Sequence, residues 1–174
     1  MNQPYIVYIA LLVVTLVSAF TDWRSGLIPN WLTYSTVVVA VAWHGSVGGF
    51  WGMTGSITGV IICGATPYLF YRMNAMGGGD VKLFAALGAI AGPGIGLEIQ
   101  LLSLSLAFFS GLAVMAYRRQ LLQKLSNTVT LMLNIVLPKA RQKPVATDSL
   151  TPLRIGSAIF AATLLCIVDR VLLV

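Results

Sequence analysis

The chain has 174 residues, of which 57% are hydrophobic and 9% charged, and it carries a formal net charge of +6. A soluble domain has about a quarter of its residues charged, so the composition excludes an ordinary soluble protein and indicates an integral membrane protein. The two cysteines, Cys63 and Cys166, lie in apolar runs without the spacing of a metal site or a disulfide framework, so we expect neither metal nor cofactor.

Six apolar segments are candidates for transmembrane helices, because a helix needs about 20 apolar residues to cross a bilayer. No basic residue precedes the first segment and no small-residue cleavage site follows it, so we interpret it as a helix rather than a signal peptide. The sequence thus predicts an all-α polytopic membrane protein of one domain, residues 1–174, with about six transmembrane helices. In chain order the segments are residues 4–20, 31–47, 50–71, 81–96, 98–117 and 152–173.

The second and fourth segments begin with distinctive residues. Asn30 follows Pro29 and is expected to cap the second segment. The apolar run after Asp80 ends at Gly92-Pro93-Gly94 and amounts to a helix of roughly 16 Å, whereas the hydrocarbon core is about 30 Å thick. Either the helix continues past Pro93 with a kink, or Asp80 lies in a recess below the membrane surface. We favour the recess, which requires protein or a water-filled cavity around it.

Lysine and arginine are concentrated in alternate loops between these segments, with Arg170 as the exception. By the positive-inside rule these loops face the cytoplasm, and both termini face outward. Two crossings separate Asp22 from Asp80, so both aspartates are predicted at the cytoplasmic end. The same pattern explains the positive charge without a nucleic-acid partner. The basic residues of these loops are Arg24, Arg72, Lys82, Arg118, Arg119, Lys124, Lys139, Arg141, Lys143 and Arg154.

The loop of about residues 118–151 is the only long polar stretch. Apolar residues recur at helical spacing in its first half, which predicts an amphipathic helix at about 119–137 on the cytoplasmic membrane surface. A cytoplasmic helix packed on the transmembrane helices is the alternative. Residues 139–151 are predicted to form a flexible basic linker in contact with anionic lipid.

Two of the five acidic residues, Asp22 and Asp80, adjoin apolar segments at one predicted membrane face. Taken singly, Asp80 is expected to cap a helix and Asp22 to pair with Arg24 at the surface. Acids are costly near lipid, however, and are usually functional there. If the two meet, they share a proton. The ionised carboxylate can then take a proton from water, while the protonated one polarises a peptide carbonyl.

Nucleophilic catalysis by a histidine-dependent site is not favoured. His44 is the only histidine, and it has no acidic neighbour in the sequence to orient it as a base. We therefore expect His44 to be non-catalytic, and the pattern favours hydrolysis by a pair of aspartates.

Two motifs surround the aspartates. Asp22 is followed by Ile28-Pro29-Asn30, and Asp80 stands in Gly77-Gly78-Gly79-Asp80-Val81-Lys82-Leu83. Together they resemble the type IV prepilin leader peptidases, which are GxGD membrane aspartyl proteases. The resemblance covers about residues 1–115, and the short length is similar to the Tad/Flp-pilus type. The segment Thr151–Gly156 only approximates the Pro-x-Gly segment that opens the last helix of short family members.

The resemblance implies that Asp22 and Asp80 are the catalytic pair, with an active-site loop shaped by glycines. It also implies a bacterial inner-membrane enzyme that removes the basic leader from prepilins at the cytoplasmic face. Larger members carry a CxxC-containing region and methylate the new terminus, and this sequence has no such region, so peptidase activity alone is expected. The glycines are Gly77, Gly78 and Gly79, and neighbours that could tune the aspartates or contact substrate are Lys82, Arg24, Pro29 and Asn30.

Two other functions are compatible with the pattern. A small proton- or ion-coupled transporter would use the two aspartates as a relay, although the inverted repeat of many transporters is not evident. A non-enzymatic assembly scaffold would use small residues for close helix packing, and we expect such packing whatever the function. The glycines concerned are Gly48, Gly49, Gly52, Gly55 and Gly59.

Overall fold

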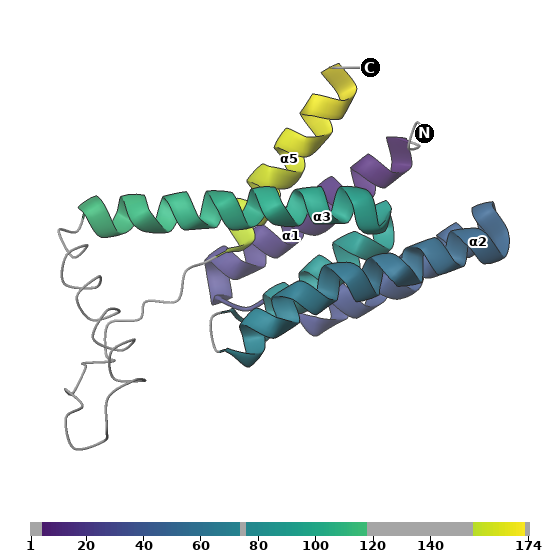
Figure 1. Ribbon diagram of the computed structural model, residues 1–174, viewed down its shortest axis with the longest axis horizontal. Helices are drawn as coiled ribbons and strands as arrows, with labels where there is room; N and C mark the ends of the chain where they lie inside the picture. Colours follow the sequence, from purple (N-terminus) through teal and green to yellow (C-terminus); the bar gives the residue numbers. More distant parts are fainter. Residues whose placement is uncertain (1–4, 74–75, 118–154, 173–174) are drawn as a thin grey trace. The chain divides into compact units, whose positions relative to one another are not determined.

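The computed structural model describes residues 5–73, 76–117 and 155–172 (Figure 1). These residues form four α-helices and no strand, which confirms the all-helical prediction for this part of the chain. The expected amphipathic helix at 119–137 and the linker at 139–151 lie outside the described residues. The helices are α1 (Tyr5–Ser25), α2 (Asn30–Arg72), α3 (Gly78–Tyr117) and α5 (Gly156–Leu172).

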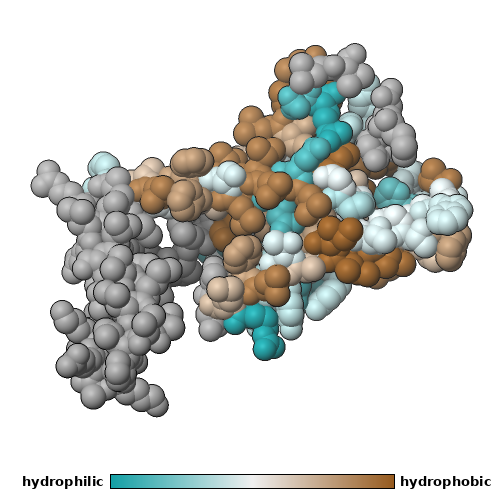
Figure 2. Space-filling view, in the orientation of Figure 1, coloured by the Kyte–Doolittle hydropathy of each residue, from teal (hydrophilic) through white to brown (hydrophobic). Residues whose placement is uncertain are grey.

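Three of the four helices are long and apolar enough to cross a membrane: α1, α2 and the Gly78–Val114 part of α3. Helix α5 is shorter, with 17 residues. Many large apolar side chains on these helices are exposed, and Figure 2 shows apolar surface over much of the visible face. Such exposure is expected where a helix faces lipid rather than water.

Helix α2 is broken at Gly49, whose φ of 58° and ψ of −147° are not helical. The Cβ of Met53 lies 3.8 Å from a Cβ built on Gly45, whereas residues eight apart in a straight helix are about 12 Å apart. A side chain on Gly52 would likewise overlap the backbone oxygen of His44. The chain therefore reverses at Gly49, between the predicted segments 31–47 and 50–71.

Helix α3 is broken in the same way at Gly92, with φ of 77° and ψ of 174°. A Cβ on Gly96 would lie 3.0 Å from the Cα of Gly88, so the chain also reverses here. The predicted boundary after residue 96 was late, because positive φ at Gly92 and the missing amide of Pro93 end the first segment sooner. Residues 78–91 amount to about 21 Å of helix, less than the bilayer core.

The second segment of α2 packs against the first segment of α3 through glycines. A Cβ on Gly59 would overlap the carbonyl oxygen of Gly88, and a Cβ on Gly88 would overlap that of Gly59. Gly55 has open space around it, so only part of the predicted glycine run serves this packing. Contacts between small residues let helix backbones approach closely within a membrane.

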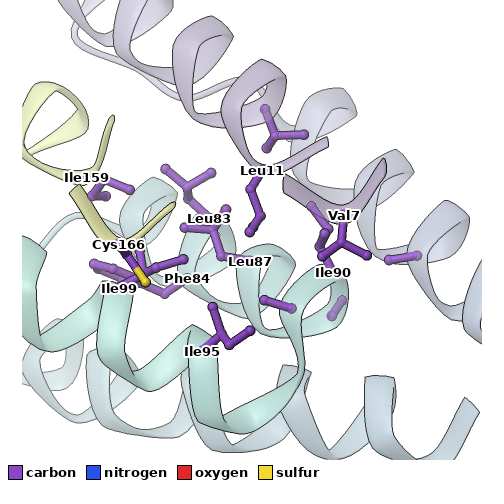
Figure 3. Packing of buried hydrophobic residues seen from close by; sticks show 14 of the residues in the cluster. Val7, Leu11, Leu83, Phe84, Leu87, Ile90, Ile95, Ile99, Ile159 and Cys166 are labelled. Carbon is purple, nitrogen blue, oxygen red and sulfur yellow. The ribbon is translucent and has the colours of Figure 1, made fainter. Parts of the chain in front are cut away.

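The buried core joins α1, α3 and α5, as Figure 3 shows. Its side chains are fully enclosed at Leu11 on α1, at Phe84 and Leu87 on α3, and at Ile159 on α5. Dispersion contacts of this kind hold helices together where lipid tails are as apolar as the core. The core fixes the first segment of α3 beside α1, and so brings the helices that carry Asp22 and Asp80 together.

The described residues belong to two compact units, and the first holds residues 5–73, 76–106 and 155–172. All contacts described above lie in the first unit. The described residues of the second are 107–117, the last turns of α3, where the rings of Phe108 and Phe109 meet edge to face. The single domain over residues 1–174 stays a prediction.

Candidate functional site

Asp22 lies in the last turn of α1, where the sequence had suggested a loop. The residues one and two turns earlier on the same buried face, Ser18 and Thr15, donate their hydroxyl protons to carbonyl oxygens of their own helix. A carboxylate cannot be satisfied in that way, because it accepts hydrogen bonds only. Although Asp22 is only 8% exposed, it therefore needs a donor from another element.

That donor is Gly156, the first residue of α5. Its backbone N–H donates to Oδ2 of Asp22 at 3.0 Å, a bond buried within the bundle. A Cβ on Gly156 would lie 2.8 Å from the same oxygen and 2.9 Å from the Cβ of Asp22, so the approach requires glycine. The approximate Pro-x-Gly match at 151–156 was the sequence signal for this contact, but it did not indicate which side chain Gly156 meets.

Asp80 lies in the first turn of α3 and is partly buried. The helix begins at Gly78, so Asp80 is not the capping residue that the sequence had allowed. Its carboxylate lies beside the backbone of Gly77. A Cβ on Gly77 would stand 3.2 Å from the carboxylate oxygen Oδ2, which is a tight fit.

The other two glycines of the loop also face neighbours closely. A Cβ on Gly79 would lie 3.2 Å from the Cβ of Ile28, in the connection between α1 and α2. A Cβ on Gly78 would lie 3.4 Å from the ring of Tyr71, near the end of α2. The absence of side chains on these glycines therefore lets the start of α3 approach the connection between α1 and α2 and the end of α2.

The structure brings the two predicted site aspartates together. Their carboxylates lie within range of mutual electrostatic interaction, although they come from α1 and α3 and stand far apart in the sequence. Asp22 is held by the backbone donor of Gly156, and Asp80 lies beside Gly77. Surroundings of low polarity strengthen such an interaction relative to water.

Of the four neighbouring residues named from the sequence, Lys82 and Asn30 contact each other. Lys82 donates to Oδ1 of Asn30 at 2.8 Å and lies over the ring of Tyr34. Asn30 is thus engaged with α3, and it does not cap α2 as expected: Pro29 holds the cap position without a side-chain hydrogen bond. Arg24 is exposed in the last turn of α1.

Glu98, Arg170 and His44 serve contacts between helices. Glu98 pairs with Arg170, which joins α3 to α5. His44 shares a hydrogen bond of 2.9 Å with the carbonyl of Ile90, which joins α2 to α3. Among the described residues, no group of three or more His, Cys, Asp or Glu side chains is placed to hold a metal ion.

A cavity of about 290 Å³ lies elsewhere, between α1, the first segment of α2 and Ile90. Its lining is almost entirely apolar and includes neither aspartate. The lining residues of α1 run from Ile6 to Val14, at least two turns from Asp22. We therefore assign the candidate site to the two aspartates and not to this cavity.

A sequence model of the type IV leader peptidase family matches residues 9–117. The chain belongs to this family. Both aspartates and the glycine loop fall inside the matched region, while Gly156 falls outside it. Family membership and the long apolar helices together make the protein a membrane peptidase. Comparisons with curated proteins and with solved structures found no match.

Proposed function

We propose that this member of the leader peptidase family is a membrane aspartyl endopeptidase that removes the basic leader from type IV, Flp-like prepilins. The observation that carries the proposal is the mutual electrostatic interaction of the Asp22 and Asp80 carboxylates, with Asp22 held by the Gly156 amide and Asp80 beside the glycine loop. Hydrolysis by an aspartyl protease requires two interacting carboxyl groups.

The proposed reaction needs one water and no covalent intermediate. The ionised aspartate takes a proton from water as the water oxygen attacks the scissile carbonyl carbon. The protonated aspartate gives its proton to the carbonyl oxygen, which produces a neutral gem-diol. In the collapse of the gem-diol the C–N bond breaks: the aspartate that took the water proton gives it to the leaving amine, and one hydroxyl proton of the gem-diol passes to the other aspartate. The products are a carboxylic acid and a new amino terminus, and the carboxyl pair again holds one proton.

The proposed topology has six crossings. The reversals at Gly49 and Gly92 divide α2 and α3 into two segments each, and together with α1 and α5 they supply six helical segments. The distribution of lysine and arginine then places the aspartates at the cytoplasmic face of a bacterial inner membrane and both termini outside. We propose peptidase activity without N-methylation, in a single domain.

The test is cleavage of a purified prepilin by the full chain in detergent, followed by mass analysis of the products. Asp22→Asn and Asp80→Asn should each lower kcat by about 10³-fold or more, because each carboxyl group transfers a proton in the reaction. Asp169→Asn is the matched control, since Asp169 is exposed on α5 and has no part in the proposed reaction. Appreciable cleavage by either site variant would remove that aspartate from the mechanism.

A further inference from the structure

We infer that Lys82 is a positioning residue, which holds the start of α2 against the start of α3 and thereby fixes Asp22 relative to Asp80. This inference rests on the proposed function, because its effect is measured on the same reaction. The contacts that carry it form one group, here called the Lys82 bridge: Lys82 on α3 with Asn30 and Tyr34 on α2.

The direction of the Lys82 side chain separates it from Asp80. Residues two apart on a helix point about 200° from each other, so Lys82 and Asp80 lie on opposite sides of the first turns of α3. The ammonium group donates to Oδ1 of Asn30 at 2.8 Å and lies 5.3 Å from the centre of the Tyr34 ring. Among the described residues, Lys82 has no ion pair with Asp80.

The partners of Lys82 adjoin the connection that follows Asp22. Asn30 is the first residue of α2, and the connection from Gly26 to Pro29 joins it to α1. The same connection contacts α3 a second time, because Ile28 lies directly against Gly79. A polar contact at Lys82 and an apolar contact at Gly79 therefore hold the start of α2 and the connection before it against the turn that carries Asp80.

The position of this connection matters for the reaction, since a displacement of about 1 Å between reacting groups can cost two orders of magnitude in rate. The bridge is near the surface, so its loss alone should loosen the connection rather than unfold the bundle. We therefore expect its loss to lower kcat and to leave the affinity for substrate unchanged.

The test is a double-mutant cycle on prepilin cleavage with Lys82→Met, Asn30→Leu and the two combined. Each single variant should lower kcat about tenfold with unchanged KM and an unchanged pH profile, and the combined variant should be no slower than the slower single one. Lys82→Arg should keep most activity, because a guanidinium can donate to Asn30 and stack on Tyr34. Arg72→Met, which removes an exposed cation at the end of α2, is the control and should match the unmodified protein.

Hydrogen exchange provides a readout that does not depend on cleavage. The amides of residues 26–30 should exchange faster in Lys82→Met and in Asn30→Leu to the same extent, and no faster in the combined variant. Additive losses, unchanged exchange, or a shifted pH profile in Lys82→Met alone would overturn the inference. The last result would mean that Lys82 acts on the charge of Asp80. If the unmodified protein cleaves no prepilin, the proposed function fails. The exchange measurement still tests whether the Lys82 bridge holds residues 26–30 in place.

Discussion

At the residue scale, the candidate site includes a backbone donor from α5 that reaches the buried carboxylate of Asp22. Hydroxyls on the same face of α1 are satisfied within their own helix, and Asp22 alone requires a partner from α5. The motifs in the sequence predicted both aspartates and the glycine loop as site residues. The sequence could not identify Gly156 as the donor, because that contact spans 134 positions and depends on how two helices pack.

Replacement of Gly156 by alanine should displace the Asp22 carboxylate. The added Cβ would stand 2.8 Å from Oδ2 and 2.9 Å from the Cβ of Asp22, so the Asp22 side chain must shift to make room. We expect kcat/KM for prepilin cleavage to fall about 10²-fold. The neighbouring change Ser157→Ala, at an exposed position, should leave the rate unchanged. Equal activity of the two variants would show that the Gly156 contact does not position Asp22.

At the element scale, hydropathy defined where apolar helices lie but not where they end. The first predicted segment stopped at residue 20, whereas α1 continues to Ser25, where the Ser25 hydroxyl donates to the carbonyl of Thr21 and the Gly26 amide to that of Asp22. The break at Gly49 fell where the sequence placed it. The sequence placed the second break near residue 97 and not at Gly92, since the apolar residues after Pro93 resemble a continuing helix.

The glycine contact between α2 and α3 makes a stability prediction. Gly59→Ala and Gly88→Ala each place a methyl group against a backbone carbonyl, which neither helix can relieve without moving apart. Each should destabilise the folded state by about 1–3 kcal/mol, as overpacking does. Thermal unfolding in detergent measures the effect. Gly55→Ala in the same helix is the control, because it has open space and should unfold like the unmodified protein. A normal unfolding temperature for Gly59→Ala would refute the close contact.

At the scale of the whole molecule, charge distribution predicted the orientation, and the reversals at Gly49 and Gly92 supply the turns that such a topology needs. Cysteines placed at Arg72 and at Phe50 should be labelled from opposite sides of sealed vesicles, with Arg72→Cys on the cytoplasmic side. Both positions are exposed, and the native Cys63 and Cys166 are buried. Labelling of both positions from one side would show that the second segment of α2 does not cross.

The convergence of the two aspartates is tested most directly by cross-linking. Asp22→Cys and Asp80→Cys would be combined in a protein in which Cys63 and Cys166 are replaced by alanine, and then treated in membranes with a short bifunctional thiol reagent. We predict that one molecule of reagent bridges the two cysteines, seen as a single cross-linked peptide by mass analysis. Separate modification of each cysteine by its own reagent molecule, without a bridge, would contradict the account.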